Sequence, residues 1–172
     1  MDVRTSLIAV VCAFTMGASP SAAATALPDD PPDVARCIQK ASVEFGIPEL
    51  PLWVILDVER GTLGQVSQNT NATYDIGPMQ INSIWLPRLE QRFGITENDV
   101  LNDLCTNIFV GAWIYTQEYI RLGSTARAIA HYHSPTPRHQ HRYLGMIEQA
   151  IERRLRRIER SEQQRASAVA MN

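Results

Sequence analysis

Glu59 is the residue of this sequence whose type and position best fit acid–base chemistry. Leu52, Ile55 and Leu56 precede it by seven, four and three residues, so all four side chains share one helix face, which we expect to be buried. A carboxyl group on an apolar stripe, near the negative end of a helix dipole, is held toward its protonated form. Such a group can act as a general acid at neutral pH. The alternative is a helix-end Glu that turns out to water.

A second polar segment, TYDIGPMQINS at residues 73–83, follows a short way downstream. Asp75, Gly77 and Pro78 combine a polar turn residue, a permissive backbone position and a fixed φ angle, which predicts a loop. We expect a helix to begin directly after it, at Met79. One interpretation of Asp75 is purely structural, as a turn residue that accepts hydrogen bonds from backbone N–H groups ahead of Gly77.

The elements that must position these residues are predicted to be helices of a single, mainly α domain. Thr96 and Asp99, three residues apart, have the spacing of a capped helix start. The last helix has a stripe formed by Tyr143, Ile147, Ile151, Leu155 and Ile158. A short β-hairpin fits within residues 62–75. Apolar periodicity places the helices over residues 34–46, 50–61, 79–94 with an interruption near Pro87, 107–123, 124–133 and from Arg138 onward.

Three motifs, in this order, resemble those of the soluble lytic transglycosylase (SLT) domain of the lysozyme-like superfamily. The likeness is to its small periplasmic branch associated with conjugation and with type IV or type III secretion. The residues that carry it are Glu59-Arg60-Gly61, GPMQI at 77–81 and AIAHY at 128–132, with NIFVGA at 107–112 similar to the start of the family's core helix. The likeness covers roughly residues 35–140. The chain departs from the family pattern at Arg60 (usually Ser), Pro78 (often Leu) and 133–135 (usually Asn-Ala-Gly).

This resemblance implies a reaction on peptidoglycan glycan strands that needs no cofactor. Glu59 would protonate the oxygen of the β-1,4 bond between N-acetylmuramic acid and N-acetylglucosamine. The resulting carboxylate would take the proton of the muramic 6-hydroxyl, which closes on C1 to give a 1,6-anhydro end. By the same resemblance Met79, Gln80 and Asn82 bind the sugar, and Tyr132 lies near Glu59 to orient it. The alternative for Tyr132 is a core tyrosine whose hydroxyl bonds to a backbone carbonyl.

Two other functions stay open at this point. Retaining glycosidases pair the acid with a second carboxylate about 5 Å away. Asp75 stands where animal-type lysozymes carry that group, so a hydrolytic muramidase using Glu59 and Asp75 is one alternative. A non-catalytic, peptidoglycan-binding assembly protein is the other, favoured by Arg60 and by the altered loop after Tyr132. The implied partners are glycan strands and components of a secretion or conjugation machine, for which the enzyme would open the wall locally.

The remaining chemically suggestive residues have simpler interpretations. His131, His133, His139 and His141 form two His-x-His pairs, but no Cys or acidic residue joins them locally. We therefore expect surface polar residues and no metal. Asp57 points away from the Glu59 face and is expected to be solvated. The tryptophans lie on apolar helical faces, where core packing is the default: Trp53, Trp85 and Trp113.

The N-terminus has the layout of a secretory signal peptide, residues 1–26. Arg4 precedes a short apolar run, too short to span a bilayer comfortably, and Ala-x-Ala spacing predicts cleavage after Ala24 or Ala26. A lipid anchor on Cys12 is disfavoured by the bulky residue before it. The expected location is the periplasm, with no stable membrane span once the signal is removed. A lysozyme-like domain at 33–140 and a basic C-terminal helix or tail at 141–172 would follow.

Two cysteines remain after this cleavage, Cys37 and Cys105. An even pair in an exported chain predicts a disulfide; the alternative is two buried thiols. The formal net charge is −2, which gives no electrostatic footprint for nucleic acid. The charge is unevenly distributed, however, because residues 138–172 hold eight Arg and four Glu. This basic tail is either a solvated helix face or a contact for anionic envelope components.

Overall fold

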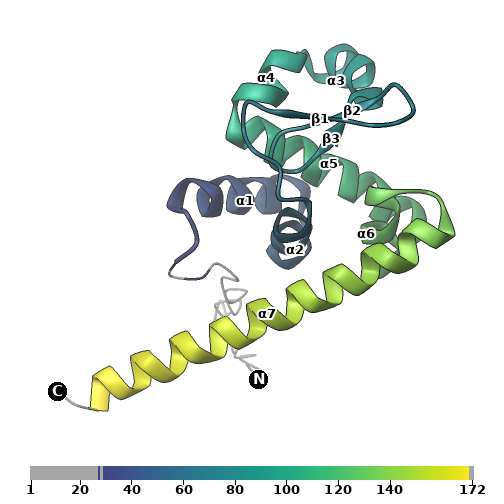
Figure 1. The fold of residues 1–172 in the computed structure, drawn as a ribbon. Helices are drawn as coiled ribbons and strands as arrows, with labels where there is room; N and C mark the ends of the chain where they lie inside the picture. The colour runs from purple at the N-terminus through teal and green to yellow at the C-terminus, as the bar shows by residue number, and fades with distance from the viewer. Residues whose placement is uncertain (1–26, 28, 171–172) are drawn as a thin grey trace, which may run out of the picture.

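Helix α5 (Leu104–Leu122) is the central element of the computed structural model, which describes Leu27 and residues 29–170 (Figure 1). The expected signal peptide and Cys12 lie outside the described residues. Helices α1 (Pro32–Phe45) and α6 (Thr125–His133) pack along α5. A disulfide between Cys37 and Cys105 joins α1 to the first turn of α5, as the sequence predicted. Most of the middle of α5 is buried, from Asn107 to Thr116.

Helix α2 (Glu49–Glu59) supplies a second strongly apolar segment to the core. It ends at Glu59, two residues before the predicted end, because Arg60 adopts the left-handed conformation with φ 51°. The Gly61 N–H then donates to the Pro78 carbonyl at 3.3 Å, and a Cβ at Gly61 would collide with the Gly77 carbonyl. The absence of a side chain at Gly61 thus lets the end of α2 lie directly against the loop at 77–80.

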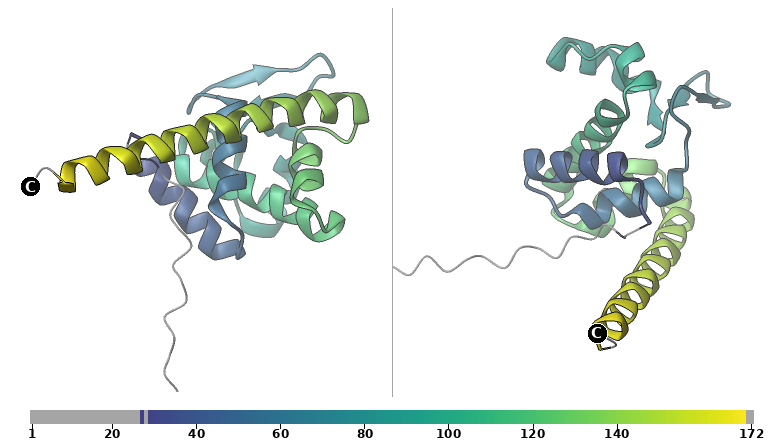
Figure 2. Two further views of the ribbon diagram at one scale, coloured as in Figure 1. Left: turned by 90° about the horizontal axis from the view of Figure 1, so that it is seen from below. Right: turned by 90° about the vertical axis from the view of Figure 1, so that its left-hand side faces the viewer.

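Helix α7 (Pro137–Ala170) is the longest element, about 51 Å at 1.5 Å per residue. It crosses α2 and α6, and its C-terminal end projects beyond the rest of the molecule (Figures 1 and 2). The predicted stripe is buried at Tyr143 and Ile147, but Leu155 is 46% exposed. Among the described residues of α7 none beyond Arg154 is buried. Only the first half of this helix therefore belongs to the core.

A small antiparallel sheet connects α2 to the remaining helices. Its strands are β1 (Val66–Gln68), β2 (Tyr74–Ile76) and β3 (Ile81–Asn82), in that order. The β1–β2 hairpin confirms the expected one and extends it to Ile76. In the register, Asp75 lies opposite Ser67 on one side and opposite Asn82 on the other.

The predicted helix over 79–94 is wrong in its first part. Gln80 has φ 48°, which a right-handed helix cannot contain, and Ile81–Asn82 pair with β2 instead. The Asn82 side chain caps a 3-10 turn, η1 (Ser83–Trp85), and α3 (Leu86–Phe93) begins only then. Pro87 lies in the first turn of α3, where proline is favoured, so it starts this helix and does not interrupt it.

The loop after α3 leads into α4 (Glu97–Asn102) through the predicted capping box. The Thr96 hydroxyl accepts from the Asp99 N–H, and the Asp99 carboxylate accepts from the Thr96 N–H.

In the described part of the chain, no helix is both long and apolar enough to cross a membrane. Taken together, the helices and the three short strands give a mainly α architecture with one short sheet, as expected.

Candidate active site

A cleft of about 700 Å³ lies between the sheet and the ends of α2, α5 and α6. Most of the residues that line it have polar side chains. Glu59 comes from the end of α2, Asp75, Gln80 and Asn82 come from the sheet, and Tyr132 comes from α6. The structure thus brings together in one cleft five of the six residues that the sequence assigned to catalysis or substrate binding.

Glu59 lies at the base of this cleft with its side chain only 13% exposed. The Tyr143 hydroxyl donates a hydrogen bond to Glu59 Oε1 at 2.7 Å, and His133 Nδ1 lies 3.9 Å from the same oxygen. Burial raises the pKa of Glu59 to about 7, the hydrogen bond from Tyr143 opposes this shift, and the negative charge of Asp75 adds to it. A carboxyl group with this pKa is present in both protonation states near neutral pH, as acid–base catalysis requires.

Tyr143 and His133 both lie beside the Glu59 carboxyl group and stack on each other. Their rings stack with centroids 4.3 Å apart and an interplanar angle of 1°. Burial, together with the neighbouring Glu59, raises the pKa of Tyr143, so its hydroxyl stays a hydrogen-bond donor. Burial and the neighbouring His139 lower the pKa of His133. The group that faces Glu59 from α6 is therefore a neutral imidazole at pH 7.

Tyr143 belongs to an apolar stripe in the sequence, and its contact with Glu59 was not predicted. The two residues are 84 positions apart, and no local pattern links them. A general signal was nevertheless present, because the hydroxyl of a buried tyrosine needs a partner.

Tyr132 lines the same cleft as Glu59, and its hydroxyl bonds to a backbone carbonyl. The hydroxyl donates to the Met79 carbonyl at 2.8 Å, as in the alternative given for this residue. Burial first, then the charges of Glu59 and Asp75, raise the pKa of Tyr132 well above its ordinary value. Tyr132 thus stays neutral, and its hydrogen bond fixes the loop that carries Gln80.

The loop at 76–80 is held from behind by Asn107, a fully buried side chain of α5. Its Nδ2 donates to the carbonyls of Ile76 and Val100, both at 3.0 Å, and its Oδ1 accepts from the Met79 N–H at 2.9 Å. Gly77 adopts φ +66°, and a Cβ at this position would collide with the Asn107 amide. The glycine of the second motif is therefore required by both its backbone angle and this close contact.

Met79 and Gln80 point in opposite directions from this loop. Met79 is 0% exposed and packs against Gly111, so it does not line the cleft where the resemblance placed it. Gln80 does line the cleft, and its Nε2 donates to the Gly77 carbonyl at 2.9 Å. The physical reason is the turn at 77–80, in which Gln80 adopts a left-handed backbone with φ 48° directly after Met79.

Asp75 lies in strand β2 and not in a turn. Its Oδ2 accepts from Asn69 Nδ2 at 3.0 Å and its Oδ1 accepts from Asn82 Nδ2 at 2.7 Å. The expected bonds to backbone N–H groups are thus replaced by two side-chain amides, which fix the carboxylate in the cleft. Asn69 is a further cleft residue that the sequence analysis did not single out.

The histidines divide between the cleft and its surroundings. His131, His133 and His139 line the cleft, and His131 Nδ1 lies 3.1 Å from Arg121 Nη2. Across Leu27 and residues 29–170, no group of three or more His, Cys, Asp or Glu side chains is arranged to hold a metal ion.

These features define a mainly α protein whose cleft holds one buried carboxylic acid beside a fixed carboxylate. No protein-family model matches the chain. It is 29% identical to Invasion protein IagB of Salmonella typhi over 143 residues, which are 80% of this chain and 88% of that protein. It is 32% identical over 103 residues to Invasion protein IagB of Salmonella typhimurium strain LT2, and 30% identical over 107 residues to a peptidoglycan-binding-like protein of Escherichia coli O157:H7. The match covers 59% and 58% of this chain and 64% of each of these two proteins.

Proposed function

We propose that this protein is a peptidoglycan lytic transglycosylase in which Glu59 is the catalytic acid and base. The observation that carries the proposal is the buried Glu59 carboxyl group, with a pKa of about 7, in a cleft of about 700 Å³ lined mainly by residues with polar side chains. The order of the three sequence motifs supports it. So does the similarity to a protein named as peptidoglycan-binding-like.

The proposed reaction uses this one carboxyl group twice. Protonated Glu59 donates its proton to the glycosidic oxygen as the bond from C1 of N-acetylmuramic acid to that oxygen breaks. The Glu59 carboxylate then takes the proton of the muramic 6-hydroxyl as its oxygen forms a bond to C1. The products are a 1,6-anhydro end and a free 4-hydroxyl, and Glu59 returns to its protonated form.

The neighbours of Glu59 have distinct parts in this proposal. Tyr143 donates to Glu59 Oε1 and so stabilises the carboxylate formed after the first proton transfer. Tyr132 holds the loop at Met79, Gln80 presents its amide group to the sugar, and Asn82 fixes Asp75 in the cleft. Amide and hydroxyl groups of N-acetylated sugars are suited to such donors and acceptors.

The proposal also includes the cellular role of the reaction and the compartment in which it takes place. Two relatives are named invasion proteins, which fits a protein that opens the wall locally for a secretion or conjugation apparatus. Glycan strands lie outside the cytoplasmic membrane, so this function places the mature protein in the periplasm.

A hydrolytic muramidase is the second candidate, and Asp75 is the observation that favours it. Two amide donors fix the Asp75 carboxylate in the same cleft as Glu59, and its charge raises the pKa of Glu59. A retaining hydrolase would use such a carboxylate as nucleophile or electrostatic partner.

Mass spectrometry of the muropeptides released from purified peptidoglycan tests both candidates. Anhydro-muramic ends that disappear with Glu59→Gln and persist with Asp75→Asn are expected for the transglycosylase. Reducing ends that disappear with either variant would identify the hydrolase. Binding of the wall without release, unchanged by Glu59→Gln, would contradict both and identify a non-catalytic assembly protein.

A further inference from the structure

Leu27 is buried, and its backbone is held at two points. Its side chain is 5% exposed, although it belongs to a segment that precedes α1. Its backbone nitrogen donates to Asp30 Oδ2 at 2.7 Å, and its carbonyl accepts from the Asp30 N–H at 3.0 Å. The backbone of Leu27 thus makes two hydrogen bonds with Asp30, whose side chain is only 6% exposed.

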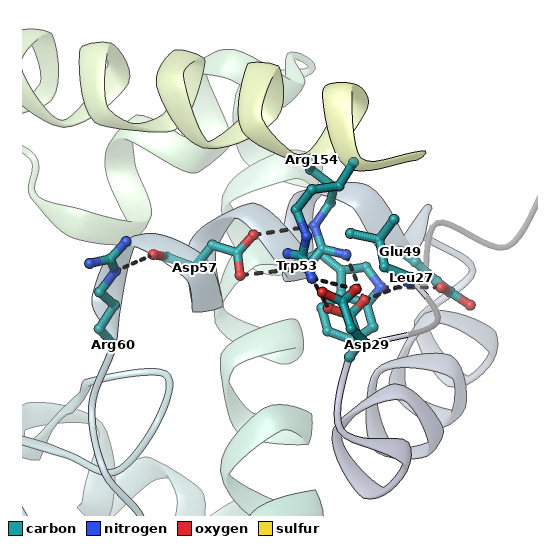
Figure 3. Close-up of polar contacts among 9 residues, drawn as sticks. Leu27, Asp29, Glu49, Trp53, Asp57, Arg60 and Arg154 are labelled. Carbon is teal, nitrogen blue, oxygen red and sulfur yellow. Dashed lines mark hydrogen bonds and ion pairs between the residues drawn. The ribbon is translucent and has the colours of Figure 1, made fainter. Parts of the chain in front are cut away.

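Asp30 belongs to an ionic cluster that joins α7 to α2. Figure 3 shows Arg154 of α7 and Asp57 of α2, which meet in this cluster. Arg154 of α7, 1% exposed, places Nη1 2.8 Å from Asp30 Oδ2 and Nε 3.2 Å from Asp57 Oδ2. Its guanidinium carbon lies 4.2 Å from the centre of the Trp53 ring. Asp57, which was expected to be solvated, is 32% exposed, and its carboxylate also pairs with this buried cation from a distant helix.

The ion pairs of this cluster join more carboxylates than cations. Arg157 pairs with Asp29 at 2.7 Å and approaches Asp30 at 3.6 Å. Among Leu27 and residues 29–170, two guanidinium groups thus pair with three carboxylates in this cluster. Glu49 adds a fourth acid that accepts from Trp53 Nε1, while Arg60 donates to the backbone carbonyl of Asp57. Of the charged groups in this cluster, Asp30 contacts the Leu27 nitrogen directly, and the others are Asp29, Glu49, Asp57, Arg154 and Arg157.

A buried carboxylate is stable only when it is paired, and the Leu27 nitrogen is the polar atom next to Asp30 that could carry another positive charge. Ala24-Thr25-Ala26 directly before it has the Ala-x-Ala spacing of a signal-peptidase site. We propose that the signal is cut between Ala26 and Leu27, and that the new α-ammonium group of Leu27 forms an ion pair with Asp30 as the third cation of this cluster.

The cut adds one water across one amide bond. Ala26 leaves with a carboxylate, and the Leu27 nitrogen becomes an amine that takes up a proton. Signal cleavage precedes folding, so the burial of Leu27 is no obstacle: the new terminus is buried as the chain folds. The inference rests on the expected export of the chain, and it does not depend on the proposed reaction.

The proposed ion pair is connected to the catalytic cleft through Arg154, which contacts α2 near Glu59. Arg154 bonds both Asp30 and Asp57, and Asp57 is two residues before Glu59 on α2. On α7, Tyr143 lies eleven residues before Arg154. The matured N-terminus thereby strengthens the contact that holds the two helices whose side chains meet at the Glu59–Tyr143 hydrogen bond.

The cleavage site is tested first. The full chain with its own leader is exported in a Gram-negative host, and the mature protein is examined by N-terminal sequencing and intact mass. The proposal requires Leu27 as the first residue. A mature protein that begins at Thr25, or anywhere else, would overturn it.

The ion pair is tested by comparing the Leu27 form with one that begins at Thr25, the product of the other predicted cut. A raised ammonium pKa gives stability that is present below the unfolded value near 8 and is lost as pH rises through the folded value. We expect the Leu27 form to have a Tm higher by roughly 2–5 °C at pH 7, with the gap closing toward pH 10. Equal Tm values, or a gap independent of pH, would contradict the ion pair.

Two further measurements separate the ion pair from a general effect of chain length. Asp30→Asn should abolish the gap between the two forms, and the matched control Asp29→Asn, in a 72% exposed side chain, should preserve it. If Asp30→Asn does not fold, the pKa of the Leu27 amine is obtained from the pH dependence of its acylation in the unaltered protein. A value at least about one unit above the ordinary value near 8 is expected. An ordinary or lowered pKa would refute the proposal.

Discussion

Tyr143 reaches Glu59 from the first turns of α7 and donates a 2.7 Å hydrogen bond to the carboxyl group on which the proposed reaction depends. The bond lowers the pKa of Glu59, while burial raises it to about 7. Two opposing effects therefore hold the carboxyl group near the pH at which it must both give and take a proton.

Wall lysis by the unaltered protein should follow the ionisation of Glu59. If Glu59 must be protonated to begin the reaction, kcat/KM should be constant below its pKa of about 7 and fall about tenfold per pH unit above it. Turbidity loss of purified walls across pH 5–9 measures this profile. A rate that rises between pH 7 and 9 would exclude Glu59 as the acid.

Tyr143→Phe should move this profile to higher pH. Removal of a donor to the charged form raises the pKa of Glu59, by about one unit for a hydrogen bond to an ion. We also expect a loss of roughly 10- to 100-fold in kcat, because the carboxylate formed in the first step loses its donor. Tyr119→Phe, in a 41% exposed tyrosine of α5, is the matched control and should leave the profile unchanged. If the fall of kcat/KM at high pH is at the same pH in Tyr143→Phe, the hydrogen bond does not set the pKa of Glu59.

Glu59→Gln should stabilise the fold at high pH while abolishing lysis. Because the folded pKa is raised from 4.5 to about 7, the folded state holds this proton more tightly than the unfolded chain. Stability therefore falls as pH rises from 4.5 to 7, by about 3 kcal/mol. Glutamine never ionises and still accepts from Tyr143. Urea unfolding should show the variant more stable at pH 8 and nearly equal at pH 4.5; a less stable variant at pH 8 would contradict the assignment.

Asn107→Ala should destabilise the protein by about 2–5 kcal/mol, since it leaves buried backbone groups of the 76–80 loop without partners. Lysis should fall as well, because Gln80 loses its fixed position. The free energy of urea unfolding and the lytic rate measure the two effects. Asn102→Ala, which removes an exposed amide contact with Asn98, serves as control and should change stability by less than about 0.5 kcal/mol. An unchanged Asn107→Ala protein would exclude the support role of Asn107.

Reduction of the Cys37–Cys105 disulfide should cost about 4 kcal/mol, because the bond closes a loop across 68 residues. Thermal unfolding with and without a thiol reductant measures the loss. The double variant Cys37→Ala/Cys105→Ala should already have the lower Tm and should not respond to the reductant. A native protein that titrates two free thiols would disagree with the structure.

The elements that carry strong local signals were predictable from the sequence. Apolar periodicity located α5, and residue spacing identified the Thr96–Asp99 capping box. The burial of Glu59 followed from its place on an apolar helix face, and its raised pKa has burial as its largest cause. These features depend on residues within one or two turns of each other, which is the range over which side-chain periodicity carries information.

Most features that were not predicted depend on distant partners. Met79 lies in a turn and not in a helix, because Asn107 and the pairing with β2 determine the backbone there. Asp57 pairs with Arg154 across 97 residues, and Tyr143 meets Glu59 across 84. No local pattern contains these contacts. The family motifs end before α7, so the resemblance could not provide them.

Helix α7 is therefore part of the same structural unit as the three motifs, because it contacts Glu59, Asp30 and Asp57. A fragment that stops after α6 would retain all three recognisable motifs and yet lack both Tyr143 and the Arg154 that pairs with Asp30 and Asp57. Any transplant, truncation or fusion that preserves this cleft and its ionic cluster should therefore extend from Leu27 through Arg157. The helix beyond Arg157 makes none of the contacts on which the proposed reaction depends.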